Sequence, residues 1–459
     1  MTGLRSLTIK AVAVFFFAGA IAVPVAFGTE PTWRQLAPAP APRQEVSYTA
    51  LGGRLYLAAG GDRSQDRYDP AANSWTEVAE LPASFNSLDH VSAVAVGGEI
   101  VYTGGLSQWE YPFPVSGATS IYDPLGDSFA TGVDMPSPRA AGGAAAWHDE
   151  LIYAGGLGSE GSVTRVDAFD PLTGEWTRLE DMPRPRDHFQ AAVVGDELYA
   201  IGGRRTFEAE GGIEFEDIAA IDVLDLPTDD EDLPAAKWRP AVSSIPTPRG
   251  GLGVAAVGTC VYAIGGELES GVTGATESYD TVGGEWRALP SLATPRHGIE
   301  AATVGKTIYV AGGGTEPFAY NPTAANEALD VAATAPCVAT QPAPAPAGSN
   351  PESPARDIAT RDRALRIERL SVRPRRVRLR SGPPRRRGAK IVLFLSEPGR
   401  VSLRLPQRFR LDIGLGAGRN VLFLPTRSHG RLLPRGRHRL VATPQPDGQA
   451  VRAPFRVVG

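Results

Sequence analysis

Short apolar runs that end on a pair of glycines recur along the first three quarters of the chain. One of them, "ELIYAGGLG" (150–158), is followed by a turn-rich stretch without helical periodicity, so it lacks the strand-to-helix setting of a phosphate-binding loop. Five further copies exist: "RLYLAAGG" (54–61), "EIVYTGG" (99–105), "ELYAIGG" (197–203), "CVYAIGG" (260–266) and "TIYVAGG" (307–313). Their number and spacing indicate a structural repeat of the propeller or solenoid kind.

Each copy predicts the same order of strands. A tight turn such as Gly52-Gly53 or Gly195-Asp196 separates two apolar runs, which is typical of a β-hairpin. A third strand follows at "YDP" or a variant of it, and a fourth strand is centred on an aromatic residue. Four short antiparallel strands make one propeller blade. The residues predicted to be structural are the diglycines, such as Gly60, Gly61, Gly155 and Gly156, and the aromatics Trp33, Trp75, Trp176, Trp238 and Trp286.

These units resemble kelch repeats of the galactose oxidase-like superfamily, over residues 32 to 336. The fold class that this resemblance implies is all-β, with a six-bladed kelch-type propeller. Trp33 precedes Arg43 by the same 10 residues that separate Trp176 from Arg186, so "TWRQLAP" (32–38) reads as a fourth strand without its first three. We expect it to complete the last blade, with "NEALDV" (326–331) favoured over "AYNP" (319–322) as that blade's third strand.

Hydropathy and charge divide the rest of the chain. Residues 1–28 have the order of a secretory signal peptide, with an uncleaved membrane anchor as the alternative. From Ala355 onward there are 26 Lys plus Arg and 6 Asp plus Glu. Of the chain's 46 basic and 51 acidic residues, 20 basic and 45 acidic residues therefore lie before Ala355, so the first part is acidic and the last part basic. The predicted domains are a propeller (29–337), a Pro/Ala-rich linker (338–360) and an Arg-rich β-sandwich (361–459). The last resembles the Ig-like or fibronectin-like modules of secreted actinobacterial proteins.

The loops of variable length predict the ligand-binding face. Strand alternation places the inter-blade loops and the loops after each diglycine on one face, which we call the loop face. Two readings of its Pro-Arg loops stay open: an anion-binding rim, or arginines that brace adjacent blades. The candidate ligand-binding residues are Arg43, Arg139, Arg186, His188, Arg249, Arg296 and His297, with Trp109 and Tyr111 of the loop 107–118.

No catalytic constellation, cofactor site or metal site is predicted. Copper radical oxidases with kelch-like propellers need a cysteine near the metal, whereas Cys260 and Cys337 fall on the opposite face, where we expect them to form a disulfide.

The sequence therefore predicts an exported, monomeric, non-enzymatic binding protein, secreted or associated with the cell envelope, for a protein or carbohydrate ligand. The alternative is an enzyme on a kelch scaffold, similar to a sugar mutarotase. The basic C-terminal module is expected to bind anionic cell-wall polymers rather than nucleic acid, unless its arginines reflect only codon usage.

Overall fold

The computed structural model describes residues 31–331 except 172, 228, 229 and 319, and, further on, the strands between 367 and 458. The predicted signal peptide, the linker 338–360 and Cys337 lie outside the described residues. Within the described part, no helix is long and apolar enough to cross a bilayer. The described residues form β-strands and two 3-10 helices, η1 (Ala83–Phe85) and η2 (Asp230–Ala235).

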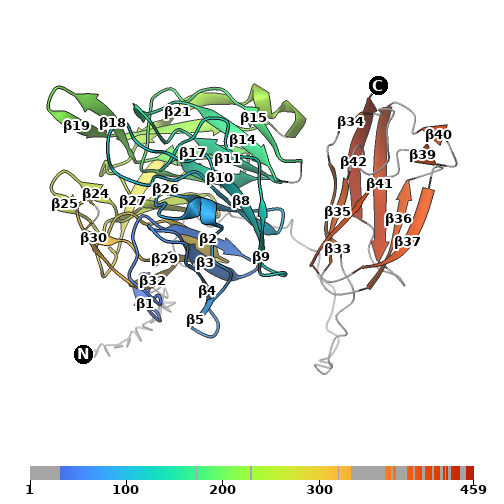
Figure 1. Cartoon of the computed structure of the whole chain (residues 1–459), viewed down its shortest axis with the longest axis horizontal. Coiled ribbons are helices and arrows are strands. Elements are labelled where there is room, and N and C mark those ends of the chain that lie inside the picture. Colours follow the sequence, from blue (N-terminus) through green and yellow to red (C-terminus); the bar gives the residue numbers. More distant parts are fainter. Residues whose placement is uncertain are drawn as a thin grey trace, which may run out of the picture.

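Six four-stranded antiparallel sheets account for the repeats and form the blades of a propeller (Figure 1). Blade 1 contains β2 (Ser47–Leu51), β3 (Arg54–Ala58), β4 (Gln65–Asp69) and β5 (Ser74–Glu77). Blade 2 contains β6 (Ser92–Val96), β7 (Glu99–Thr103), β8 (Thr119–Asp123) and β9 (Ser128–Thr131). Blade 3 contains β10 (Gly143–Trp147), β11 (Glu150–Ala154), β14 (Val166–Asp170) and β15 (Glu175–Arg178).

The remaining blades follow the same order. Blade 4 contains β16 (Gln190–Val194), β17 (Glu197–Ile201), β20 (Ala220–Asp225) and β21 (Lys237–Ser244), with a register irregularity between β20 and β21. Blade 5 contains β22 (Gly253–Val257), β23 (Cys260–Ile264), β26 (Thr276–Asp280) and β27 (Glu285–Leu289). Blade 6 contains β28 (Ala301–Val304), β29 (Thr307–Ala311), β32 (Asn326–Asp330) and, as its outer strand, β1 (Trp33–Gln35).

The sixth sheet joins the two ends of the repeat region. β1 pairs antiparallel with β32, with Trp33 opposite Leu329, and β32 in turn pairs with β29. The third strand of this blade is therefore the "NEALDV" segment, while Tyr320–Pro322 forms β31 of a separate loop hairpin with β30 (Gly314–Glu316). The first strands β2, β6, β10, β16, β22 and β28 contact one another in cyclic order, and β28 contacts β2.

The hydrophobic core lies between neighbouring blades rather than in one centre. Tyr48, Leu57 and Tyr68 of blade 1, for example, pack with Tyr309 and Ala328 of blade 6 in one buried cluster. Each blade has apolar residues on both of its faces, because each face packs against an adjacent blade.

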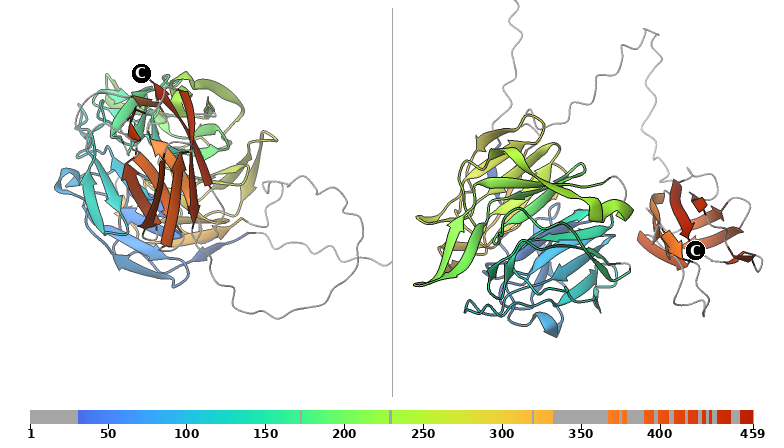
Figure 2. Two further views of the ribbon diagram at one scale, coloured as in Figure 1. Left: turned by 90° about the vertical axis from the view of Figure 1, so that its right-hand side faces the viewer. Right: turned by 90° about the horizontal axis from the view of Figure 1, so that it is seen from above.

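Additional strands extend the loops that follow the diglycines. β12 (Leu157–Gly158), β13 (Gly161–Ser162), β18 (Arg204–Ala209) and β19 (Gly212–Asp217) form a small sheet, and β24 (Glu267–Leu268) pairs with β25 (Gly271–Val272). The β18–β19 and β24–β25 hairpins and β30 project from the same side of the propeller (Figures 1 and 2). This side is the loop face.

The C-terminal strands form two larger sheets and a short hairpin, coloured orange to red in Figure 1. One sheet contains β33 (Ile367–Arg373), β35 (Lys390–Leu395) and β38 (Gly418–Phe423). The other contains β34 (Arg376–Arg378), β42 (Val451–Val458), β41 (Gly436–Pro444), β36 (Gly399–Leu405) and β37 (Phe409–Leu415). β39 (Arg427–Ser428) and β40 (Arg431–Leu432) form the hairpin.

Candidate functional site

The five arginines of the Pro-Arg loops are buried, each in an ion pair with a carboxylate on the third strand of its own blade. Four of them are 0% exposed, and Arg43 is 4% exposed. The pairs are Arg43–Asp66, Arg139–Asp167, Arg186–Asp222, Arg249–Glu277 and Arg296–Glu327.

The Arg249 pair shows what each arginine does. Its Nη1 lies 2.7 Å from Glu277, and its Nε donates a hydrogen bond to the carbonyl of Gly265, the first glycine of the blade's diglycine, at 2.6 Å. Burial of a guanidinium costs free energy unless a carboxylate and hydrogen-bond acceptors compensate for its lost hydration. The arginine thus links the inter-blade loop to the second and third strands.

Blade 2 lacks the arginine and the carboxylate together. Leu88, 5% exposed, occupies the arginine position, and Ser120 occupies the position two residues before the blade's "YDP" aromatic, where the other blades have Asp or Glu. The two changes match, because a carboxylate without its guanidinium would be buried alone.

The burial of these side chains bears on the two interpretations of the arginines. The sequence placed Arg43, Arg139, Arg186, Arg249 and Arg296 around the axial opening as candidate ligand-binding residues, but their side chains are enclosed within the blades. Their burial favours the reading in which they brace the blades.

The diglycines lie where one blade meets the next. Gly155 and Gly156 have φ of +59° and +102°, and a Cβ atom on Gly155 would lie 2.6 Å from the carbonyl oxygen of Arg186 in blade 4. The Gly156 amide donates to that same carbonyl at 2.8 Å. Gly60 and Gly61 also have positive φ, and the Gly61 amide donates to the Leu88 carbonyl of blade 2 at 3.1 Å. Only glycine combines this backbone conformation with this close approach.

The tryptophans of the fourth strands also connect blades. Four indole Nε1 groups donate to main-chain carbonyls of the preceding blade: Trp33 to Pro290, Trp75 to Ala37, Trp176 to Val133 and Trp238 to Glu180. Trp286 is half-buried and packs with a cluster between blades 4 and 5. These aromatics have the contacts of packing residues rather than of a binding site.

Six equivalent residues surround the propeller axis. Each stands in the sequence two residues after an inter-blade arginine or, in blade 2, after Leu88. We call this group the axial ring; its members are Glu45, His90, Ala141, His188, Gly251 and Gly298, and all have φ between +50° and +61°. Each of five successive members from His90 to Gly298 donates its amide to the carbonyl of the member before it, and Val46 donates to Gly298. Glycine is the natural residue for this conformation, so the four other members, Glu45, His90, Ala141 and His188, hold it at a conformational cost.

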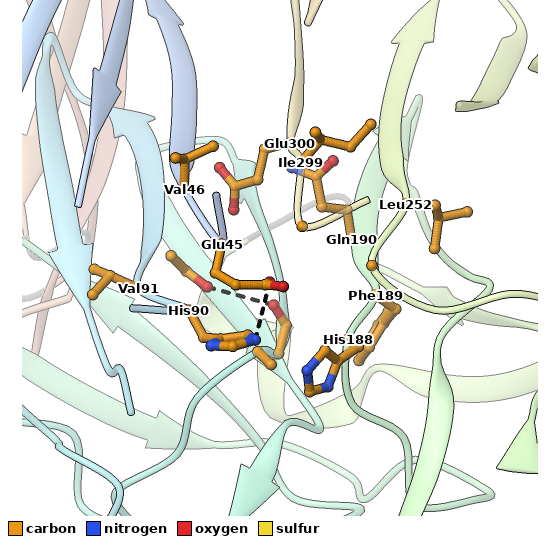
Figure 3. Close-up of a pocket in the computed structure, with 15 residues that line it drawn as sticks. Glu45, Val46, His90, Val91, His188, Phe189, Gln190, Leu252, Ile299 and Glu300 are labelled. Carbon is orange, nitrogen blue, oxygen red and sulfur yellow. Dashed lines mark hydrogen bonds and ion pairs between the residues drawn. The ribbon is translucent and has the colours of Figure 1, made fainter. Parts of the chain in front are cut away.

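Two polar members of the axial ring, Glu45 and His90, form an ion pair, and the third, His188, lies beside them (Figure 3). His90 Nε2 lies 3.0 Å from Glu45 Oε2, and His90 Nδ1 lies 2.7 Å from Asp89 Oδ1. Burial alone would lower the pKa of His90, but Glu45 and Asp89 outweigh it and raise the pKa to about 10. In the same way, burial opposes ionisation of Glu45, yet His90 holds the pKa of Glu45 well below its usual range.

His188 differs from His90 in its protonation. Its Nδ1 contacts Asp187 Oδ1, but burial and the neighbouring Arg204 lower the pKa of the imidazole. The rings of His90 and His188 meet edge to face, with centroids 4.7 Å apart. A cation and a neutral imidazole therefore lie side by side in the axial ring.

The axial ring lines a cavity of about 50 Å³ together with Gln190 and Glu300. Gln190 Oε1 accepts hydrogen bonds from the amides of Val254 and Ala301, and Glu300 accepts one from the amide of Tyr48. Burial raises the pKa of Glu300 to about 8. Beyond Gln190, the first strands of the blades, rich in alanine, line an axial channel of about 310 Å³.

Exposed aromatic side chains lie beside the axial ring on the loop face. Trp109 contacts the rings of His90 and His188, with centroids 6.4 and 5.5 Å away. Next to it, the Arg204 guanidinium lies between Trp109 and Phe215, at 5.7 and 4.4 Å from the two ring centroids. The ring centroids of Phe215 and Phe318 lie 6.2 Å apart. We call Trp109, Phe215 and Phe318, with Arg204, the aromatic strip; the three aromatics are 43%, 37% and 55% exposed.

Comparisons with known proteins bear on the repeat. A family model described as Kelch motif matches residues 138–183 and 248–293. Kelch-like protein terF of Aspergillus terreus is 29% identical over 269 residues, which cover 53% of this chain; the chain spans about half (55%) of that relative's length. The solved structure titled "Structure of YjhT" matches with a TM-score of 0.52 at 15% identity, over 63% of this chain and 95% of that chain.

The chain contains a kelch-repeat β-propeller. The repeat prediction made from the diglycines and aromatics is thereby confirmed. The likeness to the solved structure concerns the fold alone, and a fold does not specify the ligand of a kelch propeller.

The kelch propeller brings some of the predicted ligand-binding residues together and separates others. His188 and Trp109 meet at the axis. His297 is 2% exposed, and its Nε2 lies 2.9 Å from the Glu316 carbonyl oxygen. Tyr111 is half-buried and packs beside Phe113 in a cluster under the loops of blades 2 to 4.

Sequence reasoning missed the axial carboxylates and the partners of the arginines. The partners had a readable signal, since an acidic residue stands two positions before the third-strand aromatic or leucine in every unit that has a Pro-Arg loop, and Ser120 stands there in the unit that does not. Glu45 and Glu300 gave no such signal, because only the ring geometry shows that they face the axis. Among the described residues, no group of His, Cys, Asp and Glu is arranged to hold a metal ion.

Cys260 is buried in β23 and is disulfide-bonded. Its predicted partner, Cys337, lies outside the described residues, so the pairing of Cys260 with Cys337 stays a prediction.

The axial groups predict that the kelch propeller loses stability as the pH rises from mild acid to alkaline solution. Glu300 and His90 both have a folded-state pKa raised above the ordinary value, so the stability they contribute is full below their unfolded pKa values and falls as the pH rises through about 8 and about 10. We expect Glu300→Gln to remove the part of the loss between about pH 4.5 and pH 8. Thermal melts of parent and variant from pH 5 to pH 10 measure it; parallel pH profiles would contradict the prediction.

Proposed function

We propose that this chain is an exported binding protein whose kelch propeller recognises a protein or glycan ligand through the loop face. The observation that carries the proposal is the aromatic strip. Among the described residues, the exposed large aromatic side chains are Trp109, Phe215 and Phe318, and all three lie on the loop face. Solvent-exposed aromatics that gather in one place are typical of binding surfaces, where they supply contact area at low conformational cost.

The organisation of the chain supports the same proposal. We propose that β1 closes the six blades into a ring, which gives the loops a rigid base. The C-terminal strands are proposed to form an Ig-like β-sandwich whose arginines hold the protein at anionic polymers of the cell envelope. Residues 1–28 are proposed to direct export, with retention as a membrane anchor as the alternative. In this proposal the protein works as a monomer, without a cofactor.

A matched pair of variants tests the loop face. Envelope pull-downs and a glycan array with the full chain are expected to give a ligand that the triple variant Trp109→Ala, Phe215→Ala and Phe318→Ala loses. The control is Leu125→Ala with Val282→Ala, which removes two side chains that are 73% and 80% exposed in turns between third and fourth strands, away from the loop face. A ligand retained by the triple variant, or lost by the control, would contradict the proposal.

An enzyme is a second candidate, favoured by the axial ring. Burial and Arg204 lower the pKa of His188, which makes it a neutral base beside Asp187, and burial raises the pKa of Glu300, so one cavity holds a group that can accept a proton and a group that can give one. Product analysis of the saccharides that bind on the array distinguishes the two candidates. A saccharide that the parent converts and that His188→Gln binds without conversion would favour the enzyme.

A further inference from the structure

The loop face is acidic around the aromatic strip. The six loops that follow the diglycines contain 11 Asp or Glu and 4 Arg, and no Lys; they are 62–64, 106–118, 157–165, 204–219, 267–275 and 314–325. Three of the four arginines are already paired: Arg63 with Glu80 at 2.6 Å, Arg165 with Asp167 and Arg204 with Glu267 at 3.1 Å. On β19 itself, Glu214 and Glu216 are exposed on either side of Phe215. The face thus presents carboxylates and aromatic rings to solvent.

The arginines that would balance this charge are not available on the surface. The five inter-blade arginines are enclosed in ion pairs within the blades. An anionic ligand would therefore meet mostly carboxylates, whereas a cationic ligand would meet both carboxylates and the negative faces of aromatic rings.

Arg204 shows what kind of group the aromatic strip accommodates. Its guanidinium is held between Trp109 and Phe215 and pairs with Glu267, and the Glu267 carboxylate also accepts the Phe318 amide at 2.9 Å. A planar cation stacked on aromatic rings with a carboxylate at its edge is the preferred environment of arginine, and lysine fits it less well. The outer faces of Trp109, Phe215 and Phe318 offer the same surroundings to a further guanidinium from outside.

We propose that the partner recognised by the loop face is an arginine-rich polypeptide, whose guanidinium groups stack on the aromatic strip and pair with the carboxylates of the surrounding loops. This inference rests on the proposed binding function and names the class of its ligand. It chooses a basic protein segment over a glycan because of the excess of carboxylates beside the aromatic strip.

The test measures binding of a fluorescent nona-arginine peptide to the full-length chain at about 20 mM salt. We expect saturable binding that weakens as salt is added, because exposed charge pairs are screened. Trp109→Ala with Phe215→Ala should weaken binding by about tenfold, as the loss of two cation–π contacts implies. The control variant Leu125→Ala with Val282→Ala should bind like the parent, nona-lysine should bind more weakly than nona-arginine, and nona-glutamate should not bind.

A second variant covers the case in which the aromatic changes disturb folding. Glu214→Gln with Glu216→Gln changes exposed side chains only, and should reduce both the affinity for nona-arginine and its dependence on salt. Nona-arginine binding that none of these variants alters would be diffuse electrostatic attraction and would overturn the proposal, as would no binding at all.

Two further outcomes separate this inference from the proposed function. A ligand found on the glycan array that needs the aromatic strip, together with no peptide binding, would leave the binding function standing and overturn the basic partner. Peptide binding that appears only after the chain is cut within 338–360 would identify the chain's own basic C-terminal region as the occupant, and would overturn a partner supplied by another protein.

Discussion

Removal of residues 32–38, which include β1, is expected to lower the melting temperature of the kelch propeller more than the single substitution Trp33→Ala. The deletion leaves β32 as an unpaired edge strand and uncovers the cluster in which Trp33 packs with Ile308 and Leu329. Thermal melts followed by circular dichroism give the difference from the parent.

A point variant resolves the contribution of Trp33 within this strand. Trp33 is half-buried and donates to the Pro290 carbonyl at 2.9 Å, so Trp33→Ala should cost about 2–3 kcal/mol, somewhat less than the loss of a fully buried aromatic. At about 2 °C for each kcal/mol in a domain of this size, the melting temperature should fall by about 4–6 °C. The control is Arg34→Ala, which changes an exposed neighbour on the same strand. A deletion that melts like the parent would show that the sixth blade does not need β1.

Loss of one arginine from a buried pair should be costly, while loss of the whole pair should be tolerated. Arg249→Leu leaves the Glu277 carboxylate buried beside only the Thr247 hydroxyl, and should cost about 3–5 kcal/mol. Arg249→Leu with Glu277→Ser copies the Leu88 and Ser120 combination of blade 2 and should recover most of that loss.

Chemical denaturation of the parent, of Arg249→Leu, of Glu277→Ser and of the double variant gives the coupling energy between the two positions. The pH dependence adds an independent check. In Arg249→Leu the pKa of the unpaired, buried Glu277 should rise, so this variant should be most stable in mild acid, where the carboxyl group is protonated. Equal losses for the single and double variants would show that Arg249 acts through its hydrogen bonds to carbonyl groups rather than through Glu277.

Much of the fold could be predicted from the sequence because the same pattern of residues occurs in six units. The diglycines, the tight turns and the aromatics each mark a backbone position that physical chemistry restricts, such as the positive φ at Gly155 or the indole that reaches a neighbouring carbonyl from Trp176. The extra strand at Trp33 was readable for the same reason, since its distance to Arg43 repeats that of complete units.

The candidate site was less predictable because it depends on which neighbours surround each side chain. Arg139 looks like a surface residue in a Pro-Arg loop, and only the position of Asp167 on the adjacent strand shows that it is enclosed. Glu45 and His90 are 45 residues apart in different blades, and their ion pair follows from the geometry of the axial ring rather than from any motif. The aromatic strip combines three loops whose lengths differ from unit to unit, so no repeat pattern places Trp109 near Phe215.

The pairing of β1 with β32 constrains the order in which this propeller can assemble during synthesis. Gln35 and Glu327, which share a hydrogen bond across the two strands, are 292 residues apart. β1 leaves the ribosome first and must wait, with its edge unpaired, until the last blade has been made. Contacts of such long sequence separation form slowly, because the ends of a long chain segment must meet before any energy is gained. Nascent chains that stop short of residue 330 would keep this first strand free, which makes the incomplete propeller a natural substrate for chaperones.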